Sequence, residues 1–136
     1  MKFYLAKTDP DTYSIHDLER ERSTAWDGVR NPQAVRAIRE MRPGDRVFIY
    51  HSGGTSAVVG IATVTSAPRE DPKDSKSAIV DFEFAGRIEP PVTLADIKKS
   101  GEFNEWALVR QGRLSTMPAP EKFVAWMRKR RPQAQI

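Results

Sequence analysis

The run RVFIYH at residues 46–51 constrains the fold more than any other stretch of the chain. Its nearly continuous apolar character over the length of a strand indicates a strand buried on both faces. The turn residues Pro43-Gly44-Asp45 precede it, and a Gly-Gly-Thr-Ser connection at residues 53–56 leads into a second apolar run, Ala57–Val64. The two runs therefore predict a β-hairpin with a long loop.

Three more stretches predict strands: Phe3–Ala6, Ala78–Phe84 and Arg113–Thr116. In the second, apolar residues alternate with acidic ones, which is typical of a sheet with one solvated face. Pro90-Pro91 is expected to interrupt the chain after it, because proline cannot donate to a strand ladder. The polar stretch 68–77 is expected to lie outside the sheet.

Capping residues in the sequence predict where several helices begin. Asn31 followed by Pro32 predicts a helix that runs to about Met41 and leaves the six residues before Asn31 in a loop. Ser14 and Thr93 are the predicted caps of two short helices, and Pro118 and Pro120 introduce a final one. The stretch 103–109 fits either a helix or a loop.

These elements predict a small, mainly β barrel covered by helices, formed by one domain that spans residues 1–136. With no cysteine, the chain has neither a disulfide framework nor a thiolate zinc site. The 22 Lys+Arg against 18 Asp+Glu give a net charge of +4, a mild excess compatible with a polyanionic partner. The absence of a signal peptide and of a long apolar run predicts a soluble, cytoplasmic protein with no membrane partner.

A search for catalytic chemistry finds no convincing set. His51-Ser52 is the one adjacent base and nucleophile, but successive strand residues point to opposite faces. Two histidines without a carboxylate cluster make a metal site improbable, and no glycine motif fits a phosphate loop or a dinucleotide. We therefore predict no enzymatic activity, no metal and no cofactor.

Several residue types instead suit recognition. Trp26 either fills the core or stacks against a ligand, and Asn31 either caps its helix or reads a base edge. Arg36, Arg39 and Arg42 fall three apart on one helical face, which is either simply exposed or follows a phosphate backbone. The basic run Arg128–Arg131 fits a helix C-terminus as well as a nucleic-acid contact.

Three motifs together resemble a known family: WDGVRNPQA at residues 26–34, MRPGD with VFIYHS at residues 41–52, and VGIA at residues 59–62. They are similar to the EVE domain, and the similarity continues through Asp71-Pro72, Val80–Phe82, Pro91–Leu94 and Arg113–Ser115. Two positions depart from the family pattern: Tyr4 stands where tryptophan is usual, and Asp9-Pro10 where Glu-Pro is usual.

This resemblance implies an α+β, PUA-like fold, a mainly antiparallel β-barrel of five to six strands flanked by short helices and related to the YTH and ASCH domains. It also implies a non-catalytic pocket for a modified base in DNA or RNA. The positions that match the pocket are Lys7, Thr8, Asp9, Trp26, Val29, Asn31, His51, Ser52, Leu114 and Ser115.

The leading hypothesis is a monomeric reader that binds nucleic acid and takes up a flipped, modified base, with Arg30, Arg36 and Arg39 on the phosphates. One alternative is an enzyme acting on a modified nucleoside, for which Lys7, Asp9 and His51 are the candidate titrating residues. The other is a general RNA-binding module without preference for a modification.

Overall fold

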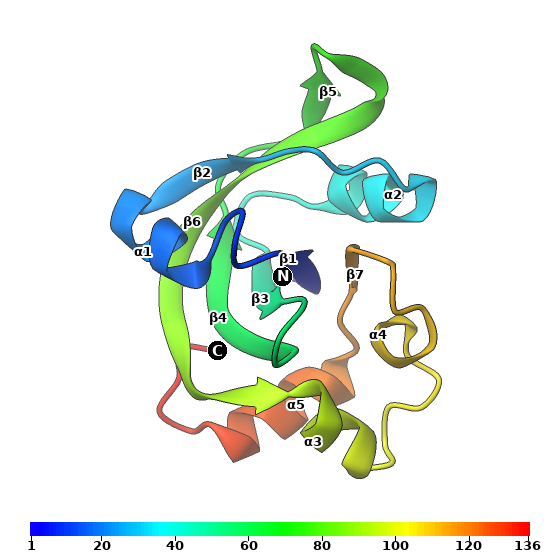
Figure 1. Cartoon of the computed structure of the whole chain (residues 1–136). Coiled ribbons are helices and arrows are strands. Elements are labelled where there is room, and N and C mark those ends of the chain that lie inside the picture. Colours follow the sequence, from blue (N-terminus) through cyan, green and yellow to red (C-terminus); the bar gives the residue numbers. More distant parts are fainter.

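The computed structural model describes the whole chain, residues 1–136, as a seven-stranded sheet with five helices packed around it (Figure 1). The α+β class is confirmed, with one or two strands more than predicted. The strands are β1 (Phe3–Thr8), β2 (Ser23–Trp26), β3 (Arg46–His51), β4 (Ala57–Val64), β5 (Arg69–Asp71), β6 (Asp74–Thr93) and β7 (Thr116–Pro118). The helices are α1 (Ile15–Glu21), α2 (Pro32–Glu40), α3 (Leu94–Lys99), α4 (Ala107–Arg110) and α5 (Glu121–Arg130).

The sheet has the strand order β2-β6-β4-β3-β1-β7, and β5 pairs with β6 outside this path. The pairing is antiparallel throughout except for β1 and β3, which run parallel. Because β2 and β7 end the path, the sheet is open. The long strand β6 curves along one side of the molecule, from the β5–β6 hairpin at one end to α3 at the other (Figure 1).

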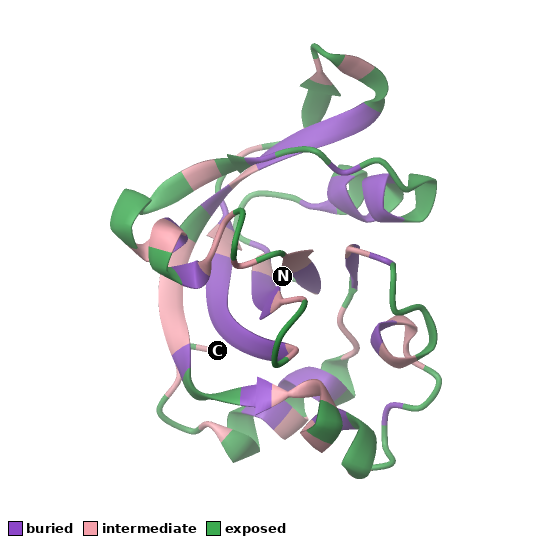
Figure 2. Cartoon of the chain, viewed as in Figure 1, coloured by how far each residue is buried: buried purple, intermediate pink, exposed green.

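The core is one cluster of 35 buried residues that centres on β3 and β4 (Figure 2). Val47, Phe48, Ile49 and Tyr50 are each at most 2% exposed, which confirms that β3 is buried on both faces. Phe123 of α5 meets the ring of Phe48 edge-on at 5.3 Å and thereby fixes the last helix on the sheet. None of the helices combines the length and the apolar character that a membrane crossing requires.

The predicted helix starts are confirmed at the level of single hydrogen bonds. The Asn31 side chain accepts from the backbone N–H groups of Gln33 and Ala34, and Pro32 is the first residue of α2. Ser14 forms a capping box with Asp17, and Thr93 caps α3. The stretch 103–109, which fitted either a helix or a loop, overlaps the short helix α4 at its last three residues.

Four predictions about the strands were wrong. The polar stretch 68–77 was expected to lie outside the sheet, but it contains β5 and the start of β6, which pair with each other. Trp26 was expected in a loop but ends β2, where it pairs with Val80. Arg113–Ser115 is not a strand, because pairing with β1 begins only at Thr116. Pro90-Pro91 does not end β6: the register jumps from Arg87 to Val92 opposite β4, so the prolines lie in a bulge where no ladder N–H is needed.

Candidate functional site

A cavity of about 390 Å³ opens beside Trp26, at the end of β1 and β2. Three regions that are distant in sequence build it: residues 7–13, residues 24–30 and Ser115. Its lining consists of Lys7, Thr8, Thr12, Tyr13, Thr24, Ala25, Trp26, Asp27, Gly28, Val29, Arg30 and Ser115. We call it the Trp26 cavity. Its volume lies within the range of ordinary small-molecule pockets.

Trp26 serves both the core and the cavity. Its side chain is 8% exposed, and its ring lies 4.9 Å from the ring of Phe82 on β6. Tyr13 meets it edge-on from the cavity side at 6.1 Å. The two readings of this indole are therefore compatible, because one surface packs inward and the other contributes to the cavity wall.

The loop between β2 and α2 forms the rest of that wall and is tied down at both ends. Gly28 has a φ of +76°, a conformation that side-chain-bearing residues rarely adopt. Next to it, the carbonyl of buried Val29 accepts a short hydrogen bond from the hydroxyl of Ser77 on β6. Asn31 then caps α2. These contacts hold the Val29 side chain at the wall.

Lys7 lines the cavity at the end of β1, and its ammonium has contacts just outside the lining. Its ammonium donates to the carbonyl of Gly112 at 3.0 Å and lies 5.5 Å from the ring centroid of Tyr50. Burial lowers the pKa of Lys7, because partial removal of water disfavours the charged form. The backbone N–H of Lys7 also donates to the carbonyl of Ser115 at 2.7 Å, which brings Ser115 to the cavity.

Thr8 and Tyr13 link the cavity to α1. The Thr8 hydroxyl donates to the Tyr13 carbonyl at 2.7 Å, and the Tyr13 hydroxyl donates to Glu21 at 2.8 Å. Burial is the main cause that raises the pKa of Tyr13, with Glu21 adding to it. The wall that carries Tyr13 therefore depends on where α1 sits.

The structure brings together half of the ten positions assigned to the base pocket. The residues from that set that line the Trp26 cavity are Lys7, Thr8, Trp26, Val29 and Ser115, and Arg30 lies beside them. Arg36 and Arg39 do not line it. They are exposed on α2, the helix that begins directly after the cavity loop.

The other five positions serve the fold instead of lining this cavity. The Asp9 carboxylate accepts from the backbone N–H of Asp11, and the side-chain oxygen Oδ1 of Asn31 is engaged in capping α2. Ser52 donates to the Thr8 carbonyl at 3.4 Å, and Leu114 is 2% exposed within the core. His51 faces a separate cavity of about 320 Å³ together with His16 and Arg87.

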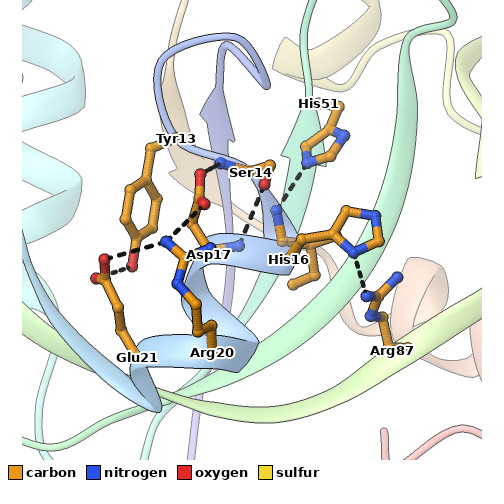
Figure 3. Close-up of polar contacts among 9 residues, drawn as sticks. Tyr13, Ser14, His16, Asp17, Arg20, Glu21, His51 and Arg87 are labelled. Atoms are coloured by element: carbon orange, nitrogen blue, oxygen red, sulfur yellow. Dashed lines mark hydrogen bonds and ion pairs between the residues drawn. The ribbon is translucent and has the colours of Figure 1, made fainter.

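Figure 3 shows why His51 lies outside the Trp26 cavity. Its Nε2 accepts the backbone N–H of Ile15 at 3.0 Å, so the ring holds the first turn of α1 against the end of β3. On the neighbouring residue, His16 Nδ1 contacts the guanidinium of Arg87. Burial lowers the pKa of His51, and the neighbouring His16 and the Arg87 guanidinium lower it further.

Sequence reasoning missed several lining residues, chiefly Thr12, Tyr13 and Thr24. Tyr13 could have been suspected as an aromatic residue in a turn just before a helix cap. Thr24 carries no such signal, because its strand was not predicted. A larger cavity of about 660 Å³ lies between β1 and α5, but it contains none of the assigned pocket positions.

Comparisons with known proteins give a family match and several matches of fold. The EVE domain family model matches residues 2–130. Thymocyte nuclear protein 1 of Mus musculus is 26% identical over 156 aligned residues, which cover 88% of this chain and 69% of the mouse protein. A crystal structure of a protein from Agrobacterium tumefaciens is 30% identical, with a TM-score of 0.91, and the match covers 100% of this chain and 97% of that one.

The fold is also similar to human THYN1, whose structure was determined in complex with DNA that contains 5-methylcytosine. The two chains are 23% identical with a TM-score of 0.83, and the match covers 93% of this chain and 96% of the human one.

Proposed function

The chain belongs to the EVE domain family, and from this premise we propose that it binds nucleic acid and holds one modified base in the Trp26 cavity. The base is a modified cytosine in DNA or a modified base in RNA. The protein reads this base and catalyses no reaction on it.

The observation that carries the proposal is the convergence at Trp26. Residues as distant as Lys7 and Ser115 meet around one aromatic wall, in a cavity of the size that suits a small ligand. An aromatic surface flanked by hydrogen-bonding side chains is the usual way to hold a base that has left its stack. Human THYN1, a protein of the same fold, forms a complex with DNA that contains 5-methylcytosine.

The positions of the titratable residues favour binding over catalysis. Of Lys7, Asp9 and His51, only Lys7 lines the cavity. His51 is occupied as an acceptor for the backbone of α1, and Asp9 accepts from its own turn. A general acid–base mechanism would need a second titratable group within hydrogen-bond reach of the reacting atoms. The other titratable groups of the cavity with this chemistry are Tyr13, whose hydroxyl donates to Glu21, and Asp27, which is exposed.

The tested substitution must not disrupt the core, because Trp26 is buried, with 8% of its surface exposed. Truncation to alanine would remove a packed aromatic side chain at a cost of about 3–5 kcal/mol. Trp26→Phe keeps a ring against Phe82 but removes the indole surface and its N–H. We expect this variant to bind a 5-methylcytosine oligonucleotide at least about threefold more weakly, a small share of the stacking energy of a base on an aromatic ring.

Fluorescence anisotropy with oligonucleotides that differ only in the methyl group measures this effect. Trp126→Phe is the matched control, since Trp126 is a partly buried tryptophan on α5, at the other end of the molecule (Figure 1). Equal affinity of the wild-type protein for methylated and unmodified oligonucleotides, unchanged in Trp26→Phe, would exclude 5-methylcytosine as the base that the Trp26 cavity holds.

A further inference from the structure

Lys7 is a partly buried cation without a counter-ion. The seven ion pairs of the structure all involve other residues. Its polar contact is the Gly112 carbonyl at 3.0 Å, and its remaining neighbour is the face of Tyr50. An ammonium has three N–H donors, so two of them remain for water or for a ligand in the Trp26 cavity.

A ligand that fills the cavity displaces the water that solvates this ammonium. A neutral, apolar substituent would leave the two N–H donors unpaired, and an unpaired buried charge is costly. An anionic substituent would replace the lost water with a charge-assisted hydrogen bond, which is about twice as strong as a neutral one.

The rest of the lining adds donors rather than competing anions. Thr12, Thr24 and Ser115 carry hydroxyl groups, and Arg30 adds a second positive charge. Asp27 is the single carboxylate, and it is exposed in the same loop as Arg30. The electrostatic balance inside the cavity therefore favours a ligand rich in acceptors.

We propose that Lys7 makes the Trp26 cavity selective for a base that carries an anionic substituent, with a carboxylated pyrimidine preferred over a methylated one. This inference rests on the proposed function, because it concerns the same cavity. It adds the chemical class of the modification and assigns its recognition to one residue.

The test compares three oligonucleotides that contain cytosine, 5-methylcytosine or 5-carboxycytosine at one position. We expect the wild-type protein to bind the carboxylated oligonucleotide at least about tenfold more tightly than the methylated one. Lys7→Met keeps most of the aliphatic stem and removes the charge, so it should abolish this ratio. Lys7→Arg should preserve part of it. Lys99→Met, at an exposed lysine of α3, is the control and should match the wild type.

A pH titration gives an independent readout. The lowered pKa of Lys7 means that its ammonium loses its proton at a lower pH than an ordinary lysine does. The preference for the carboxylated oligonucleotide should therefore be lost at a lower pH than the 10.5 of an ordinary lysine, while binding of the methylated one changes less. Lys7→Met should show no such pH dependence of the ratio.

Three outcomes would overturn the inference. Wild-type protein that binds the carboxylated oligonucleotide no better than the methylated one would exclude the anionic class while leaving the proposed function intact. Equal weakening of all three oligonucleotides by Lys7→Met would assign Lys7 a purely structural role at Gly112. No discrimination among the three by the wild type would remove the proposed function as well.

Discussion

At the scale of single residues, the wall of the Trp26 cavity depends on a hydrogen bond between positions 48 residues apart. The Ser77 hydroxyl donates to the Val29 carbonyl, and both residues are buried. Ser77→Ala would leave that carbonyl without its donor, so we expect the free energy of unfolding to fall by about 1–3 kcal/mol. Urea denaturation measures this change. Ser75→Ala, at an exposed position of the same strand, should leave stability nearly unchanged.

Ser77→Ala should also weaken binding of the modified oligonucleotide, because the Val29 loop loses its anchor on β6. An unfolding free energy equal to that of the wild type would contradict this account. Ser77 shows what a single sequence cannot reveal, since nothing local marks it as the partner of Val29. Asn31 is the opposite case: the cap was predictable because donor and acceptor lie within four residues of each other.

At the scale of elements, α1 is attached to the sheet through a histidine that must stay neutral. His51 accepts the Ile15 N–H and cannot do so when protonated (Figure 3). The pKa of His51 is lowered from 6.5, so the folded protein binds this proton more weakly than the unfolded chain. The contribution of neutral His51 to the free energy of unfolding is therefore fully present above pH 6.5. It is lost as the pH falls from 6.5 towards the lower pKa of His51 in the folded protein. The slope is at most about 1.4 kcal/mol per pH unit for one proton.

Denaturation at a series of pH values between about 7.5 and 5 measures that slope. His51→Gln offers an amide acceptor that does not titrate, so the variant should lose most of the pH dependence. Asp17 does not contribute to the slope in this pH range, because its pKa is lowered from 3.8. Glu19 and Glu89 pair with Arg87 beside the two histidines and partly offset its charge. Equal slopes in His51→Gln and the wild type would disprove the role of His51.

Among the helices and strands, some could be predicted from the sequence and others could not. Helix starts and the strands β3 and β4 follow from local signals, namely caps and apolar runs. β2 has only four residues, and its state is decided by pairing with β6, which is remote in sequence. The continuation of β6 past Pro90-Pro91 likewise depends on a bulge opposite β4. Tertiary pairing, rather than local propensity, decided both cases.

At the scale of the molecule, the motif positions divide into those that line the cavity and those that support it. A resemblance to a family does not distinguish these two kinds of position, so both Trp26 and Leu114 were assigned to the predicted pocket. The fold separates them, because Leu114 faces the core while Trp26 reaches the cavity. The motifs therefore indicated residues that meet at one cavity, but they could not separate the residues that line it from those that support the fold.

The whole-molecule charge distribution gives a last test, which concerns the sequence-independent part of binding. Arg36 and Arg39 are exposed on α2, next to the cavity loop, whereas Lys98 and Lys99 are exposed on α3 at the opposite end (Figure 1). If α2 follows the phosphate backbone, each arginine that contacts a phosphate adds about 0.7–0.9 to the slope of log affinity against log salt concentration.

Arg36→Gln combined with Arg39→Gln should therefore reduce the salt slope by about 1.4–1.8 and weaken binding to modified and unmodified oligonucleotides by the same factor. Phosphate contacts position the nucleic acid but carry no information about the base, so the preference for the modification should persist. The matched variant Lys98→Gln with Lys99→Gln removes the same charge from α3 and should leave the slope unchanged. Equal slopes for the two double variants would mean that only the net charge acts, because a backbone path along α2 requires the location of the arginines to matter.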